Sequence, residues 1–199
     1  MLKICSQLLL YIWLSVNWGT GLPLEIGAAI PKADMNLQDV SGKDISLNKA
    51  RQANGLLVMF SGNGCPYIER NKARTKEICR YAQSNNIGVV LINATNNAAT
   101  IKDLLAGMKK YAGEQEYTWY YVADIKGELA EAFEATHTPE CFLFNPNGKL
   151  VYKGAIDDNP GNADEVKSRH LNNAINDMLA NKSPKVNTTA TIGCNIKRF

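Results

Sequence analysis

The sequence predicts an α/β domain in which a largely parallel sheet is covered by helices on both faces. Two short runs, 55–60 and 87–92, are almost entirely apolar, as is typical of strands buried on both sides. Residues 65–83 and 98–112 instead carry apolar side chains at helical spacing. Strands that alternate with helices in this way favour a parallel-rich sheet.

The remaining elements follow in order along the chain. Residues 37–40 and 45–47 flank the turn sequence Ser-Gly-Lys-Asp and are predicted to form a short hairpin. Residues 117–122 read as an aromatic strand and 129–133 as a short helix, and 163–180 are predicted to be the last amphipathic helix. The apolar residues at helical spacing in the helix 98–112 are Ile101, Leu104, Leu105 and Met108. In the helix 163–180 the inward-facing apolar residues are predicted to be Val166, Leu171, Ile175, Met178 and Leu179.

Length and composition indicate one globular domain. The chain has 199 residues, of which 45% are hydrophobic and 21% charged, which suffices for a single α/β core. A net charge of +3 is too small to indicate a nucleic-acid-binding protein. Basic residues gather only along 70–80, where we expect the solvent-exposed face of a helix.

Cys65 lies where the first apolar strand gives way to a helix. Ser61 to Gly64 have turn chemistry, and Pro66 suits the first helical position, where a missing N–H costs nothing. Cys65 is therefore expected at or near a helix N-cap. Unpaired N–H groups and the positive end of the helix dipole favour a thiolate there, so we expect its pKa to lie below that of a free cysteine.

A second signal lies far downstream, where Thr138-Pro139 precedes the apolar run 140–144. A proline just ahead of a strand fits an edge position or a cis bond in a tight turn. The turn sequence Asn-Pro-Asn-Gly at 145–148 then leads into 149–154, so the two runs are predicted to form a hairpin.

Taken together, these stretches resemble the redoxin-type, peroxiredoxin-like (AhpC/TSA) branch of the thioredoxin superfamily. The matching segments are GCPYIERNKARTKEI, ATHTPECFLFNPNGKLVYKGAIDDNP and IGCNIKRF, and the resemblance covers about residues 22–199. It implies a thioredoxin-like fold with a central mixed sheet and an N-terminal β-hairpin extension. It also implies thiol redox activity and a cis peptide at Pro139, with a redoxin domain at 22–182 and a C-terminal tail at 183–199.

The chain departs from two familiar patterns of that superfamily. Thioredoxins carry Cys-x-x-Cys, whereas Ile68 stands here in place of the second cysteine. Typical peroxiredoxins carry Pro-x-x-x-Thr-x-x-Cys, whereas Val58 and Gly62 stand here at the first two of those places. A hydroxyl at that position beside the attacking sulfur is therefore absent, and so is a local pair of cysteines.

The N-terminus has the pattern of an export signal. Lys3 precedes the apolar run 8–14, and small residues follow at 19–21. The run is short for a membrane span. We expect residues 1–21 to be a signal peptide that directs the chain to the periplasm or cell envelope, with an uncleaved anchor as the alternative.

Cleavage would remove Cys5 and leave four cysteines. Cys65 and Cys79 would lie about 21 Å apart on one continuous helix, so they cannot bond within one molecule. Cys79 has apolar neighbours and is interpreted as a core residue. Cys141 lies on a strand, so the pleat directs it either into the core or toward Cys65. Cys194 follows Gly193 in a tail with room to move, so we favour a Cys65–Cys194 disulfide and keep Cys141 or an external thiol as alternatives.

We therefore expect a thiol oxidoreductase in which Cys65 attacks a disulfide or a peroxide as the thiolate. Pro66, Thr138 and Pro139 are expected to line its substrate site. Its partners would be protein or small-molecule thiols, disulfides or peroxides, with no nucleic acid and no cofactor, and the oligomeric state stays open. One alternative is a redox-inactive thioredoxin-fold binding module, and a weaker one is a metallochaperone that uses Cys65 with His137 or Cys141.

Overall fold

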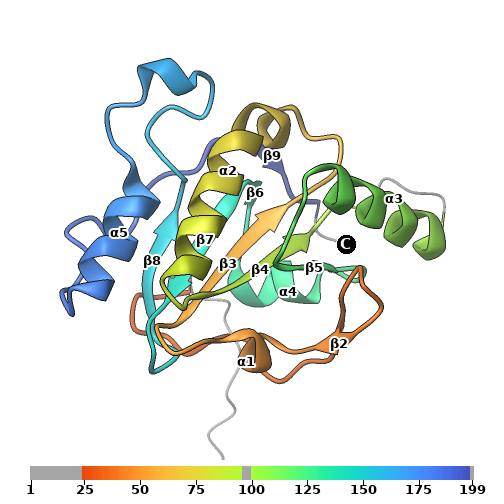
Figure 1. The fold of residues 1–199 in the computed structure, drawn as a ribbon, viewed down its shortest axis with the longest axis horizontal. Helices are drawn as coiled ribbons and strands as arrows, with labels where there is room; N and C mark the ends of the chain where they lie inside the picture. The colour runs from red at the N-terminus through yellow and green to blue at the C-terminus, as the bar shows by residue number, and fades with distance from the viewer. Residues whose placement is uncertain (1–23, 96–99, 198–199) are drawn as a thin grey trace, which may run out of the picture.

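A mixed five-stranded sheet forms the centre of the fold (Figure 1). The computed structural model describes residues 24–95 and 100–197, so the expected signal peptide at 1–21 lies outside the described residues. The strand order is β5-β4-β3-β7-β8. Strands β3, β4 and β5 run parallel to one another, β7 pairs antiparallel with β3, and β8 pairs antiparallel with β7. Their bounds are β3 Leu56–Ser61, β4 Gly88–Asn93, β5 Tyr120–Ala123, β7 Glu140–Phe144 and β8 Leu150–Gly154.

Two apolar clusters cover the two faces of this sheet. Side chains alternate along β3, so Leu57 and Met59 join one cluster while Val58 and Phe60 join the other. The first cluster packs under α2 (Pro66–Ser84), α3 (Ile101–Glu114) and α5 (His170–Leu179). The second packs under α1 (Leu47–Ala50), α4 (Glu128–Phe133) and the hairpin of β1 (Leu37–Gln38) and β2 (Asp44–Ile45). The predicted α/β fold with helices on both faces is thereby confirmed.

A separate two-stranded ladder lies beside the N-terminal end of α2 (Figure 1). It joins β6 (His137–Thr138) antiparallel to β9 (Cys194–Asn195), so it brings the C-terminal tail against the segment that leads into β7. Figure 1 shows both strands next to the end of α2 where that helix begins. The peptide bond between Thr138 and Pro139 is cis, as the resemblance implied.

Three sequence-based expectations on local structure were wrong. Residues 45–47 were expected in one strand, but Ser46 accepts a hydrogen bond from the Lys49 amide and so begins α1 at Leu47. Ile101 was placed among the helical apolar positions, yet it is 51% exposed in the first turn of α3.

The last helix is shorter than 163–180. Only a 3-10 turn at Ala163–Glu165 (η1) precedes α5, which begins at His170. Asp158 holds the intervening chain extended, because its carboxylate accepts from the Lys167 amide and its own amide donates to the Ser168 carbonyl. Within the described ranges, no helix is both long and apolar enough to cross a bilayer.

Candidate redox site

Cys65 occupies the N-cap of α2, as its place before Pro66 predicts. Its backbone is extended, with φ −79° and ψ 123°, and Gly64 just before it takes a left-handed φ of +81° that favours glycine. Pro66 fills the first turn, and no side chain caps the helix. The free N–H groups of that turn are thus available to stabilise negative charge on the Cys65 sulfur.

The sulfur of Cys65 is bonded to that of Cys194, which lies far along the chain in the C-terminal tail. The S–S distance is 2.04 Å and the two Cα atoms are 6.2 Å apart, at a sequence separation of 129 residues. This is the pairing that the sequence analysis favoured. Cys65 is only 4% exposed, whereas Cys194 is half-buried, so the tail covers Cys65 and leaves Cys194 closer to solvent.

Thr138 forms the wall of the site opposite the helix. Its carbonyl oxygen lies 3.6 Å from Cys65 Sγ, and its backbone pairs with that of Cys194 in the β6–β9 ladder. A disulfide sulfur has no proton to donate, so this carbonyl becomes a hydrogen-bond acceptor for Cys65 only when the thiol is free. The Thr138 hydroxyl is buried and has no hydrogen-bond partner among the described residues.

The other two predicted substrate-site residues, Pro66 and Pro139, are neighbours in sequence of Cys65 and Thr138. Pro139 follows Thr138 and is buried, while Pro66 follows Cys65 and is exposed. The structure thus brings Cys65, Cys194 and Thr138 into direct contact, with a proline next to each of the two walls.

A buried carboxylate that the sequence analysis missed holds this wall in place. Glu140 is 9% exposed, and its Oε2 accepts hydrogen bonds from the amides of Thr136 (2.7 Å) and His137 (3.1 Å). These bonds fix the loop that carries β6. An acidic residue in an otherwise apolar strand, directly after the proline, is the signal that could have revealed it.

Cys141, the other candidate partner for Cys65, lies elsewhere. It is unpaired, fully buried, and packed in the same cluster as Cys79 beneath α2. Burial raises the pKa of both thiols, which opposes formation of a reactive thiolate at either position. The sequence left two directions open for Cys141, into the core or toward Cys65. The pleat of β7 directs it into the core.

His137 and the acidic residues near the site show no arrangement suited to a metal. His137 Nδ1 lies 2.8 Å from the Thr136 hydroxyl and 3.4 Å from that of Thr191, so its ring contacts the tail. Within residues 24–95 and 100–197, no group of three or more His, Cys, Asp and Glu could hold a metal ion.

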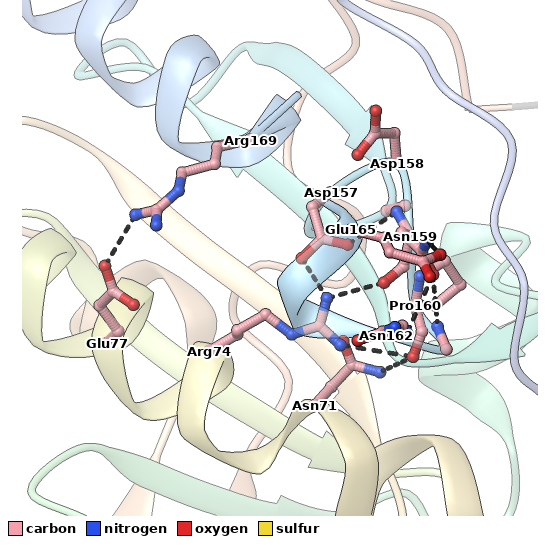
Figure 2. A network of polar contacts seen from close by, with 12 residues as sticks. Asn71, Arg74, Glu77, Asp157, Asp158, Asn159, Pro160, Asn162, Glu165 and Arg169 are labelled. Atoms are coloured by element: carbon pink, nitrogen blue, oxygen red, sulfur yellow. Dashed lines mark hydrogen bonds and ion pairs between the residues drawn. The ribbon is translucent and has the colours of Figure 1, made fainter. Parts of the chain in front are cut away.

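The loop after β8 is fastened to α2 by Arg74 (Figure 2). Its guanidinium donates to Asp157 at 2.6 Å and to the carbonyl of Asn159 at 2.9 Å, and Asn71 donates to the carbonyl of Pro160. The carboxylate of Asp157 is taken up by this ion pair.

A cavity of about 260 Å³ lies beside this ion pair, between α2 and α5. Glu77 and Arg169 both line this cavity and form an ion pair at 3.1 Å, which is drawn in Figure 2. Both arginines that line it therefore already have a carboxylate partner. Elsewhere on α2, Lys72 pairs with Glu69, and Lys76 and Arg80 share Glu116.

Comparison with known proteins finds one matching family and a thiol-disulfide oxidoreductase relative. The model of the AhpC/TSA family matches residues 26–153, which includes Cys65 and β6 but ends before α5 and the tail. The thiol-disulfide oxidoreductase ResA of Bacillus subtilis is 24% identical over 115 residues, or 58% of this chain and 60% of that protein. The chain thus spans less than two thirds of the length of this curated relative.

Two solved structures share the fold. An uncharacterised conserved protein from Geobacillus kaustophilus is 26% identical with a TM-score of 0.79, covering 87% of this chain and 92% of that one. The thioredoxin domain of a thiol-disulfide oxidoreductase from Bacteroides vulgatus is 22% identical with a TM-score of 0.53, covering 65% and 88%. The expected thioredoxin-like fold is confirmed.

Proposed function

The chain belongs to the AhpC/TSA family, and we propose that it is an exported thiol-disulfide oxidoreductase in which Cys65 attacks and Cys194 resolves. The observation that carries this proposal is the Cys65–Cys194 disulfide at the N-terminus of α2, beside the Thr138 carbonyl. It supplies the second sulfur that Ile68 cannot.

In the first step the Cys65 thiolate attacks one sulfur of a substrate disulfide. A bond forms between Cys65 Sγ and that sulfur, the substrate S–S bond breaks, and the other substrate sulfur leaves as a thiolate. The unpaired N–H groups at the start of α2 favour the charged form of Cys65 before the attack. The thiolate is the attacking species in this exchange.

In the second step Cys194, as the thiolate, attacks Cys65 Sγ in the mixed disulfide. The Cys65–Cys194 bond forms, and the remaining substrate sulfur leaves as a thiolate. The substrate has then gained two electrons, which the two protein sulfurs have lost. The Cα separation of 6.2 Å between these cysteines is within the range that a disulfide requires.

An external thiol returns the protein to its reduced state. Cys194 is half-buried and Cys65 is 4% exposed, so the external thiolate reaches the Cys194 sulfur more readily. Cys65 then leaves as a thiolate at the helix N-terminus, and a low-pKa thiol is the better leaving group. A second external thiol frees Cys194.

The same two cysteines would also reduce a peroxide, and membership of the AhpC/TSA family favours that second activity. The Cys65 thiolate would attack one peroxide oxygen, giving a sulfenic acid and an alcohol or water. Cys194 would then condense with the sulfenic acid to form the same disulfide and release water. Gly62 places no hydroxyl beside the sulfur, so we expect disulfides to be the faster substrates.

The export that we propose rests on the apolar run 8–14 after Lys3. Expression of the full chain, followed by cell fractionation and N-terminal sequencing, tests it. We expect the mature protein in the periplasm or cell envelope, starting near residue 22. A protein retained in the cytoplasm with residues 1–21 attached would contradict export.

The activity is tested by turnover with dithiothreitol as the external thiol, using cystamine and hydrogen peroxide in parallel. We expect turnover of cystamine to fall to background in Cys65→Ser, while Cys141→Ser behaves as the unmodified chain. In Cys194→Ser, Cys65 should stay bonded to cysteamine until dithiothreitol releases it, so the turnover should be slower than that of the unmodified chain and should rise with the dithiothreitol concentration. A protein that turns over neither substrate would instead support the redox-inactive binding module.

A further inference from the structure

The tail strand β9 lies on the exposed edge of β6 as a bound peptide would. Thr138 pairs with Cys194 and His137 with Asn195, and the Ile196 amide continues the ladder by donating to the Thr136 carbonyl at 2.9 Å. Backbone hydrogen bonds hold β9 on β6, and the disulfide joins β9 to Cys65 at the start of α2. An extended segment with a cysteine in this register is therefore what the site accepts in the oxidised protein.

Two positions of the tail show what such a segment must contain. A Cβ at Gly193 would stand 2.3 Å from the Thr138 carbonyl oxygen and 2.8 Å from its carbon, so only glycine fits directly before the cysteine. Two positions after the cysteine, Ile196 is 8% exposed and packs in the second apolar cluster. The pattern that the edge accepts is thus glycine, cysteine, any residue, then a branched apolar residue.

The tail is also tethered close to this edge. The Thr189 hydroxyl accepts from the Ala155 amide and bonds the Tyr152 hydroxyl, both at 2.9 Å, and its amide donates to the Lys153 carbonyl. From that anchor, an extended chain lets Cys194 move at most about 17 Å. A tether of this length keeps the effective concentration of Cys194 near Cys65 in the millimolar range.

We propose that β9 is an internal competitor for the β6 edge, and that the substrate it displaces is an extended peptide carrying glycine directly before its reactive cysteine. This inference rests on the proposed function and names its substrate class. In the reduced protein a two-residue ladder is weak on its own, so a partner strand can replace β9. Attack by Cys194 releases the partner sulfur, and re-pairing of β9 with burial of Ile196 removes the partner strand.

The test compares Cys194→Ser, which keeps the tail, with Cys194→Ser/Gly193→Leu, in which the Leu side chain prevents β9 from lying on β6. The probe is the hexapeptide Thr-Ile-Gly-Cys-Asn-Ile with thionitrobenzoate on its cysteine. Cys65 attacks the peptide sulfur, and thionitrobenzoate release is followed by absorbance. Control reagents are N-acetylcysteinamide with the same leaving group and a hexapeptide with Leu in place of Gly.

We expect the glycine hexapeptide to react at least about tenfold faster with the Gly193→Leu chain, because its competitor no longer occupies the edge. The small reagent and the leucine hexapeptide should show no such gain. Ile192→Ala in the Cys194→Ser background is the matched control, since Ile192 is 56% exposed and its loss should leave the rates unchanged.

Equal rates for the two chains would overturn strand competition, and so would an equal gain for the small reagent, which would mean that the tail merely shields the sulfur. A labelled hexapeptide with serine for cysteine measures binding without chemistry, by fluorescence anisotropy. If it binds more tightly to the Gly193→Leu chain while Cys65 reacts with no reagent, strand competition stands and the redox function fails. If Cys65 reacts but both peptides react equally fast with the two chains, the redox function stands and strand competition fails.

Discussion

The backbone of Gly193 lies directly against that of Thr138, so closely that a Cβ at position 193 would stand 2.3 Å from the Thr138 carbonyl oxygen. This contact lets β9 bring Cys194 to Cys65. It also joins the two parts of the site that are far apart in sequence, the segment before β7 and the C-terminal tail.

Gly193→Ala should therefore make the Cys65–Cys194 disulfide easier to reduce. The added methyl group pushes β9 away from β6 and lowers the effective concentration of Cys194. We expect at least about a tenfold fall in the equilibrium constant for disulfide formation, or about 30 mV in the reduction potential. Equilibration with dithiothreitol measures it. Gly161→Ala is the control, because its Cβ would meet only Asn159 Oδ1 at 3.6 Å.

Cys79 and Cys141 should be inert in the folded, reduced protein. Both are fully buried, and burial raises the pKa of each thiol. Treatment with iodoacetamide at about pH 8.5, near the pKa of a free thiol, followed by peptide mapping, should find label on Cys65 and Cys194 but not on Cys79 or Cys141. Label on Cys141 at a rate similar to that on Cys65 would contradict the buried placement.

Arg74→Met should destabilise the fold, because it leaves a buried carboxylate without its partner. The Asp157 side chain is 3% exposed and that of Arg74 14%, and the same guanidinium also holds the loop carbonyl of Asn159. We expect a loss of about 3 kcal/mol in the free energy of unfolding, measured by urea denaturation. Arg70→Met is the matched change, since Arg70 is exposed beside Tyr67, and should cost less than about 1 kcal/mol.

Asp124→Asn should gain stability relative to the unmodified protein as the pH rises. Burial raises the pKa of Asp124 above 3.8, even though its carboxylate accepts from the amides of Leu129 and Ala130. A raised pKa in the folded state means that stability present below pH 3.8 is lost as pH rises through the folded-state value. The asparagine variant lacks this loss.

Urea unfolding at a series of pH values from about 4 to 7 covers the window above the unfolded carboxyl pKa. The difference between Asp124→Asn and the unmodified chain should grow in favour of the variant and then level off. Asp158→Asn is the contrast, because its hydrogen bond with the Ser168 backbone lowers the pKa of Asp158, and its difference should stay flat over this range. A flat difference for Asp124→Asn would contradict the assignment.

Much of the fold could be predicted because its strands are buried on both faces. Apolar runs such as 55–60 have no competing interpretation once turn residues bound them, and Pro66 marks the start of α2. The position of Cys65 at the helix N-cap follows from those two signals. The direction of Cys141 could not be predicted, because it depends on the register of β7 against β3, which only the folded sheet sets.

The β6–β9 ladder has no periodic signal in the sequence. Each strand has two residues, so neither alternation nor length distinguishes it from a loop. The 163–169 segment was mistaken for helix because its spacing is helical, whereas hydrogen bonds to Asp158 determine its path. The role of Cys194 could be inferred only by excluding the other cysteines.

The most direct measurement of the central claim counts thiols released when the fully reduced protein meets an equimolar amount of a thionitrobenzoate mixed disulfide. We predict two thiols released per chain, with Cys65 bonded to Cys194 in the peptide map. The Cys194→Ser chain should release one thiol and keep the reagent on Cys65. A single thiol released by the unmodified chain, with Cys194 free in the map, would contradict resolution by Cys194.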